Sequence, residues 1–145
     1  MMPVARASIS IAAPRGRVWN AFVDPKVIER YMPVADFSAD WVEGGQMTWR
    51  FEWLGRPAEV RGTVVRVDPQ RALGYRYSRP IFRAGASAQP AERQRVVTIE
   101  LFDEGAGTRI ALSEENNATG QELAHAEGGW RLALNNLKAL LESGS

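Results

Sequence analysis

The sequence contains no cysteine, only one histidine and no long apolar run, and each absence excludes a class of protein. Without cysteine there are no disulfides, no thiolate metal sites and no cysteine nucleophile, which suits a reducing compartment. One histidine leaves only carboxylates as metal ligands, and their spacing matches no known cation loop, so we expect no metal site. The N-terminus lacks the apolar stretch of a signal peptide, and no run of about 18 apolar residues occurs, so we expect a cytoplasmic protein that does not enter a membrane.

The chain also lacks an excess of charge of either sign, because it has 18 basic and 17 acidic residues and a formal net charge of +1. We therefore expect no binding to nucleic acid or to an anionic membrane surface. The sequence has no nucleophile elbow, no phosphate-binding glycine loop and no dinucleotide fingerprint, and nothing in it indicates a cofactor. Its 145 residues suit a single domain, 1–145, with one core.

The first part of the chain predicts a strand followed by two short helices. Residues 4–12 alternate apolar and polar side chains, which is typical of a half-buried strand. Pro14 is suited to the start of a helix, and residues 15–24 repeat apolar side chains at helical spacing. The Asp-Pro pair that ends this stretch is a good start signal for a second short helix at 26–31.

From residue 41 to residue 116 the hydrophobic period falls to two, which predicts about six antiparallel strands. Turn residues separate the strands, and the stretch 79–94 has no periodicity and is expected to form a long loop. The clearest hairpin runs through residues 96–116 around a glycine-rich turn. One strand carries large residues almost without interruption on one face: Met47, Trp49, Phe51 and Trp53.

The last segment, 121–142, predicts one long amphipathic helix with a single apolar face formed by Leu123, Trp130, Leu134, Leu137 and Leu141. At about 1.5 Å per residue it spans roughly 33 Å, which is enough to cross a sheet. The order of elements predicts an α+β fold: a curved antiparallel sheet of about six to seven strands wrapped on the C-terminal helix, with two short helices after the first strand. A sheet that curves around a helix without touching it everywhere leaves a pocket.

Four stretches carry a resemblance to a known family: IAAPRGRVWNAFVDPKVIERYM, GTVVRVDPQRALGYRY, VTIELFDEGAGTRIALSEEN and HAEGGWRLALNNLKALLE. In this order and spacing, the chain resembles the SRPBCC, or START-like, superfamily, and within it the branch related to the activator of the ninety-kilodalton heat-shock protein ATPase. The resemblance implies a helix-grip fold with a mostly apolar cavity between the terminal helix and the concave sheet. Members use such cavities for lipids, sterols, hormones and polyketides, and some are cyclases, so the fold leaves the function open.

The large residues of the sheet and the terminal helix are the candidate cavity walls: Trp49, Phe51, Trp53, Tyr75, Tyr77, Leu112 and Trp130. We expect Tyr31 and Met32 to lie at the entrance of this cavity. A row of large residues on one strand face is equally typical of a filled core. A buried tyrosine places its hydroxyl either on a fixed protein acceptor, which is the commoner case, or on a guest molecule.

Three further positions are candidates for the site, two because they are polar and one because it leaves space. Alternation along the last strand points Glu114 inward, where it would orient a ligand or move a proton unless a cation such as Arg50 or Arg76 pairs with it. We expect those two arginines on the outer face. His125 is a candidate base or polar anchor. Gly129 and its neighbour Gly128 are costly inside a helix, so either close packing or space for a ligand should explain them.

The leading hypothesis is a noncatalytic protein that binds a small hydrophobic or amphipathic molecule. The alternatives are a cyclase- or dehydratase-like enzyme that uses Glu114, His125 or a tyrosine in the same cavity, and an interaction module that acts as a homodimer or chaperone accessory. An enclosed volume above about 300 Å³ favours ligand binding, whereas a filled interior favours the interaction module. Catalysis requires two titratable groups to converge inside that volume.

Overall fold

The computed structural model describes residues 4–32, 36–53, 55–77, 95–115 and 120–143. The side chain of Trp53 and the whole of the predicted loop at 79–94 lie outside this description. The elements follow in the order β1 (Ala5–Ile11), α1 (Arg15–Val23), α2 (Pro25–Tyr31), β2 (Asp36–Ala39), β3 (Gln46–Trp53), β4 (Arg56–Asp68), β5 (Ala72–Tyr77), β6 (Arg95–Glu104), β7 (Gly107–Glu115) and α3 (Gly120–Glu142).

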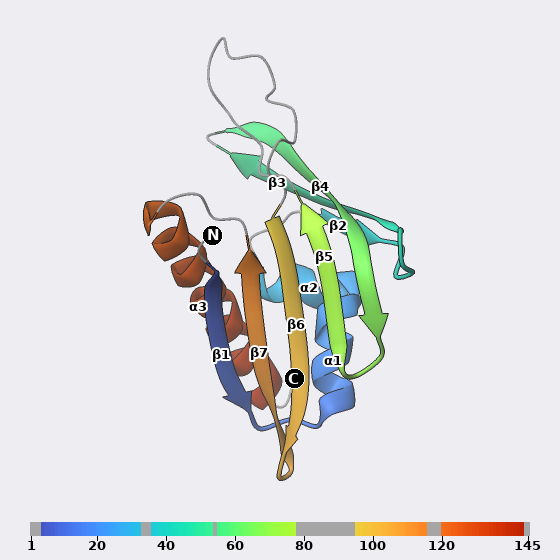
Figure 1. The fold of residues 1–145 in the computed structure, drawn as a ribbon, viewed down its shortest axis with the longest axis vertical. Coiled ribbons are helices and arrows are strands. Elements are labelled where there is room, and N and C mark those ends of the chain that lie inside the picture. The colour runs from blue at the N-terminus through green and yellow to red at the C-terminus, as the bar shows by residue number, and fades with distance from the viewer. Residues whose placement is uncertain (1–3, 33–35, 54, 78–94, 116–119, 144–145) are drawn as a thin grey trace.

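The strands form one antiparallel sheet of seven strands in the order β1-β7-β6-β5-β4-β3-β2. Strands β2 to β7 follow one another as a meander, and β1 closes the arrangement by pairing with β7. All three helices lie on one face of the curved sheet, with α3 along the β1 edge and with α1 and α2 behind β5 and β6 in the view of Figure 1. The predicted helix-grip fold, with two short helices after the first strand, is confirmed.

The junction between the two short helices is set by the Asp-Pro pair. The backbone N–H of Asp24 donates to the Asn20 carbonyl and ends α1. The Asp24 carboxylate then accepts a hydrogen bond of 3.0 Å from the Lys26 backbone N–H and caps α2. Pro25 follows at the first helical turn, where its missing N–H costs nothing. The pair therefore turns the chain sharply and keeps both helices on the concave face.

Strand β2 was not predicted as a separate strand. It has only four residues, Asp36–Ala39, which is too short for a two-residue period to be recognised. The meander therefore begins at Asp36, before residue 41 where the sequence predicts its start, and residues 41–45 form the turn into β3, with Gly44 at a φ of +85°. The Trp41 indole donates a hydrogen bond of 2.8 Å to the Val23 carbonyl and so ties this turn to α1.

The core lies between the concave face of the sheet and the three helices. It includes alternate residues of β6 and β7, such as Val97, Ile99 and Ile110, which are at most 3 % exposed. From α3, Leu134, Leu137 and Leu141 are buried in the same cluster, as the predicted apolar stripe requires. Leu123 and Trp130, near the start of the stripe, are only half-buried. The C-terminal half of α3 is thus the part that is packed most firmly.

Candidate functional site

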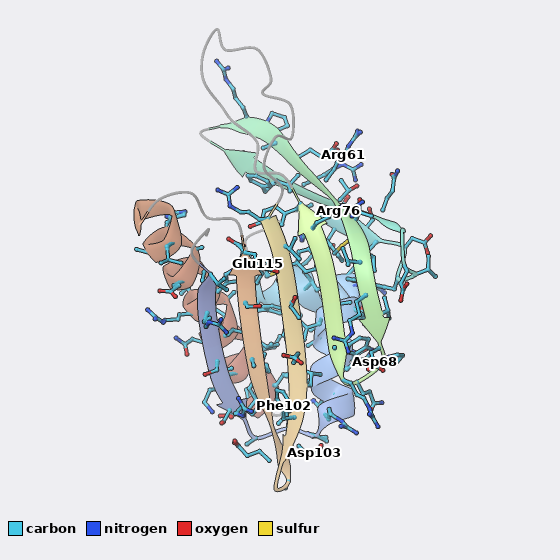
Figure 2. All side chains as sticks on the ribbon, in the orientation of Figure 1. Arg61, Asp68, Arg76, Phe102, Asp103 and Glu115 are labelled. Atoms are coloured by element: carbon cyan, nitrogen blue, oxygen red, sulfur yellow. The ribbon has the colours of Figure 1, made fainter. Side chains whose placement is uncertain are left out.

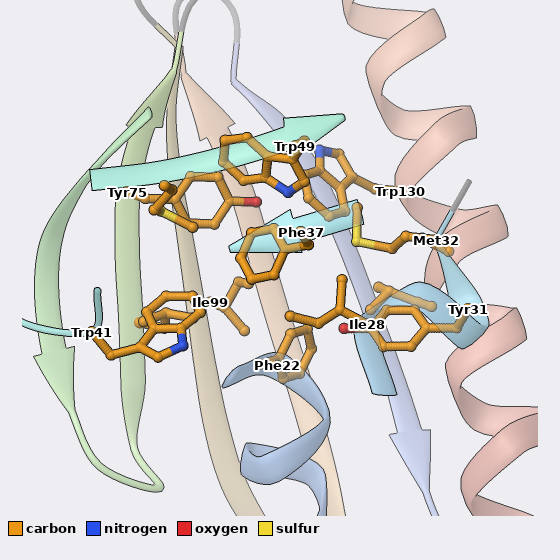
Figure 3. A pocket seen from close by; sticks show the side chains of 14 residues that line it. Phe22, Ile28, Tyr31, Met32, Phe37, Trp41, Trp49, Tyr75, Ile99 and Trp130 are labelled. Carbon is orange, nitrogen blue, oxygen red and sulfur yellow. The ribbon is translucent and has the colours of Figure 1, made fainter. Parts of the chain in front are cut away.

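A small hollow lies between the sheet and the three helices (Figure 3). Its volume is about 30 Å³, which suffices for one or two water molecules. The wall consists almost entirely of apolar and aromatic side chains: Phe22, Ile28, Tyr31, Met32, Phe37, Trp41, Met47, Trp49, Leu73, Tyr75, Ile99, Trp130, Ala133 and Leu134. The volume is far below the roughly 300 Å³ expected of a ligand-binding cavity, and most of the expected cavity is filled by side chains. By that criterion the resting structure favours the interaction module, and a ligand can enter only if part of the wall moves.

Aromatic rings from the sheet fill most of the interior because they pack on one another. The ring centroids of Trp49 lie 5.4 Å from Tyr75, 6.0 Å from Tyr77 and 5.6 Å from Phe37, at tilted angles. Tilted and edge-on contacts at these distances are favourable because the positive edge of one ring meets the negative face of another. Trp49 is thus the centre of an aromatic layer that covers the concave face of β2, β3 and β5.

Gly62 on β4 makes room for this layer. A Cβ placed there would lie 3.0 Å from the Trp49 ring and 2.7 Å from the Arg76 carbonyl oxygen. Both distances are shorter than an ordinary van der Waals contact, so any larger residue would push the indole ring off the sheet. The glycine therefore fixes how closely Trp49 lies against β4.

A polar cluster adjoins the aromatic layer and is centred on Glu114, whose side chain is completely buried. Its Oε1 accepts a hydrogen bond of 2.6 Å from the Tyr77 hydroxyl and one of 3.1 Å from the Trp130 indole. Arg95 is also buried, and its Nε lies 3.9 Å from Glu114 Oε2. The predicted inward orientation of Glu114 is confirmed, and the structure brings it together with two predicted wall residues, Tyr77 and Trp130.

The described cation beside Glu114 is Arg95, which is not among the predicted site residues. A signal was present, because Arg95 precedes Val97 and Ile99 at two-residue spacing and so shares their inward face. The aperiodic stretch directly before Arg95 makes this signal hard to recognise. The two arginines expected on the outer face are exposed there, and Figure 2 shows Arg76 on the face turned away from the helices. Arg50 pairs with Asp36 at 2.8 Å on that surface.

The register of the sheet explains why Glu114 fits inside. Glu114 lies opposite Val97 on β6 and opposite Ala5 on β1, and Val97 in turn lies opposite Tyr75 on β5. The small side chains on either side leave room for the carboxylate to reach Tyr77 and Trp130. The cluster consequently joins β5, β6 and β7 to α3 through a few polar atoms in an otherwise apolar interior.

The three tyrosines of the predicted site have different surroundings. The Tyr31 hydroxyl donates to the Ala21 carbonyl at 2.8 Å, and burial raises the pKa of Tyr31 far above its ordinary value of 10.0. Burial also raises the pKa of Tyr75 well above 10.0, and the nearby Tyr77 and Glu114 add to this shift. Tyr31 and Tyr75 are therefore neutral hydrogen-bond donors at physiological pH.

The remaining predicted site residues lie apart from the hollow or on its border. Met32 is half-buried on its wall, Leu112 is buried in the core, and Phe51 is half-buried on β3 outside the wall. His125 is exposed, so it does not converge with Glu114. Among the groups considered for proton transfer, Glu114 and Tyr77 meet within hydrogen-bond distance.

The glycine pair on α3 is not explained by close packing. Both Gly128 and Gly129 are exposed, and a Cβ at either position would meet nothing within 4 Å. They directly precede Trp130, the residue through which α3 donates to Glu114. The glycine pair, which has low helix propensity, therefore lies directly before the side chain that connects α3 to the polar cluster.

The described residues include no group of three or more histidine, aspartate or glutamate side chains that would hold a metal ion. Within the same residues, no helix is both long and apolar enough to cross a membrane.

Comparison with known proteins agrees with this geometry. The family model described as Activator of Hsp90 ATPase homolog 1-like protein matches residues 12–142. No curated protein sequence matches the chain. The solution structure of ChR145 from Cytophaga hutchinsonii is 32 % identical, with a TM-score of 0.79 over 98 % of this chain and 95 % of that one.

Two less similar structures share the fold. The Aha1 dimer from Colwellia psychrerythraea is 20 % identical, with a TM-score of 0.77 over 99 % of both chains. DynU16, a protein in the dynemicin biosynthetic locus, is 22 % identical, with a TM-score of 0.78 over 98 % of this chain and 48 % of that one.

Proposed function

Because this chain belongs to the Activator of Hsp90 ATPase homolog 1-like family, we propose that its interior binds a compact hydrophobic or amphipathic molecule between α3 and the concave sheet. The observation that carries this proposal is the hollow lined by apolar side chains with a buried polar cluster next to it. Apolar walls supply affinity through burial of the ligand surface, at about 25 cal/mol per Å². A few polar groups fix its orientation.

A ligand larger than one or two water molecules must displace part of the wall. Met32, Trp41 and Trp130 are the described wall residues that are only half-buried. Trp41 is held by a hydrogen bond of 2.8 Å to the Val23 carbonyl, whereas Trp130 is held by a longer one of 3.1 Å to Glu114. Trp130 also follows the exposed glycine pair. We therefore infer that Trp130 and the unbranched side chain of Met32 move outward to admit the ligand.

The test uses two matched substitutions on α3. Ala133 lines the hollow and is 8 % exposed, whereas Ala139 on the same helix is exposed. We expect Ala133→Leu to fill the hollow and to weaken binding of the neutral fluorescent probe N-phenyl-1-naphthylamine at least about tenfold, because overpacked cores reject extra volume. Ala139→Leu should bind like the unchanged protein. Circular dichroism and thermal unfolding establish that both variants are folded.

Native mass spectrometry of protein purified from its own host provides a second measurement. A retained small molecule that is absent from Ala133→Leu supports the proposal. If the probe binds both variants equally and no molecule is retained, the interior is not a receptor.

Self-association is a second candidate function, supported by the small hollow and by the dimeric structure from Colwellia psychrerythraea. Leu132 on α3 is 63 % exposed, the largest exposed fraction among the large apolar side chains that the structure describes, so a second copy packed on this face of α3 would bury it. Sedimentation equilibrium at micromolar concentration tests this candidate. A dimer that Leu132→Ala dissociates would support it, whereas a monomer at all concentrations would contradict it.

A further inference from the structure

Two hydrogen-bond donors point into the hollow and have no acceptor among the residues that the structure describes. The Trp49 indole comes from β3 and the Tyr75 hydroxyl from β5, and the two rings are 5.4 Å apart between centroids. Figure 3 shows the indole nitrogen and the phenol oxygen directed into the same space. The side chains are only 8 % and 6 % exposed. Neither takes part in a hydrogen bond with any residue that the structure describes.

The other polar side chains of the wall do have protein acceptors. Tyr31 donates to the Ala21 carbonyl, Trp41 donates to the Val23 carbonyl, and Trp130 donates to Glu114. Buried donors are paired in nearly all folded proteins because an unmade hydrogen bond leaves the cost of desolvation uncompensated. The Trp49 and Tyr75 donors are adjacent and face one hollow with room for one or two water molecules, so a guest molecule that displaces this water must supply the acceptor in its place.

From these contacts we propose that the hollow selects a neutral ligand with a carbonyl oxygen, which accepts hydrogen bonds from both Trp49 and Tyr75. This inference rests on the proposed function, because it names the ligand class of the same site. An indole N–H can only donate, so the ligand must supply the acceptor. A carbonyl oxygen has two lone pairs and can satisfy both donors at once.

Charged ligands fit the hollow poorly. An ammonium group has only donors and would leave both Trp49 and Tyr75 without an acceptor. A carboxylate would need a cation, and the described wall residues include no lysine or arginine. The nearby Arg95 already lies beside Glu114. The ligand class that remains is an aryl or alicyclic ketone, lactone or similar neutral carbonyl compound.

Four probes of nearly the same shape test the selection: acetophenone, ethylbenzene, benzoate and 1-phenylethylammonium. Dissociation constants come from NMR titration of the tryptophan indole resonances. We expect acetophenone to bind at least about tenfold more tightly than each of the other three. Among the four probes, only acetophenone has an uncharged oxygen that can accept hydrogen bonds from both Trp49 and Tyr75. The carbonyl stretching band of bound acetophenone should shift to lower frequency.

Two tyrosine variants provide the matched comparison. Tyr75→Phe removes the unpaired hydroxyl, whereas Tyr77→Phe removes a hydroxyl that already donates to Glu114 at 2.6 Å. We expect Tyr75→Phe to lose the preference for acetophenone over ethylbenzene and to reverse part of the infrared shift. Tyr77→Phe should keep both. Should Tyr75→Phe fail to fold, the infrared shift and the four-probe ranking in the unchanged protein still decide the question.

The outcomes separate this inference from the proposed function. Equal affinity for acetophenone and ethylbenzene would overturn the carbonyl selection but would leave hydrophobic binding supported. Tightest binding of benzoate or of the ammonium compound would overturn it in the same way. If none of the four probes nor N-phenyl-1-naphthylamine binds, the proposed function fails and the ligand class fails with it.

Discussion

Replacing Glu114 by glutamine tests whether the buried polar cluster holds α3 on the sheet. The carboxylate is completely buried, accepts hydrogen bonds from Tyr77 and Trp130, and lies 3.9 Å from Arg95. Glutamine keeps the shape and one acceptor oxygen but removes the charge. Breaking a buried ion pair by removing one partner costs about 3–5 kcal/mol. Since glutamine retains an acceptor, we expect a loss near the lower end, about 3 kcal/mol.

A loss of this size is large, because a domain is stable by only about 5–15 kcal/mol in total. At about 2–4 °C per kcal/mol for a chain of this length, it lowers the unfolding temperature by roughly 6–12 °C. Glu114→Ala removes both acceptor oxygens as well and brings the chain close to the limit of folding, so the glutamine variant is preferable. Urea titration gives the free energy of unfolding, and calorimetry gives the midpoint.

The control is the neighbouring residue. Glu115 is exposed on the outer face, as Figure 2 shows, so Glu115→Gln should change stability by less than about 0.5 kcal/mol. A double-mutant cycle of Glu114→Gln with Tyr77→Phe should give a coupling of at least about 0.5 kcal/mol, because the two side chains are in direct contact. If Glu114→Gln is no more destabilised than Glu115→Gln, the carboxylate does not tie the helix to the sheet.

Three further predictions concern α3. Gly128→Ala and Gly129→Ala should each stabilise the protein by about 0.5–1 kcal/mol in urea unfolding, because both positions are exposed with free space around them, and a loss of stability would show that the glycines are needed. The pKa of Glu142 is lowered below 4.5, chiefly by a hydrogen bond from Lys138 and then by one from the Ala12 backbone amide. The stabilising effect of this carboxylate is therefore present above pH 4.5 and is lost as the pH falls through the lowered value. In Glu142→Gln the unfolding temperature should consequently depend less on pH in that acid range than in the unchanged protein. Leu137 is completely buried, and Leu137→Ala should cost about 2–5 kcal/mol, whereas a cost below 1 kcal/mol would place it outside the core.

Much of the fold could be predicted from local patterns. The helical spacing of Leu134, Leu137 and Leu141 predicts one buried face on α3, and the structure buries all three. The two-residue alternation of β7 predicts an inward Glu114, which is also confirmed. These predictions succeed because periodicity depends only on backbone geometry, which is the same in every helix and strand.

Features that depend on distant parts of the chain could not be predicted. The partner of Glu114 is Arg95, which became apparent only when the register paired β6 with both β5 and β7. The volume of the interior depended on whether the rings of Phe37, Trp49 and Tyr75 stack on one another or stand apart. A sequence records the size of each ring but not its tilt.

The sequence by itself therefore determined the order of the elements, the curved sheet beneath a long helix and the inward direction of Glu114, because short-range spacing encodes these. Only the tertiary structure decided that the interior is nearly filled, that Arg95 lies beside Glu114, and that the Trp49 and Tyr75 donors share one small hollow. The physical reason is that packing and hydrogen-bond pairing depend on side-chain positions in three dimensions, which are fixed only when strands and helices far apart in sequence come together.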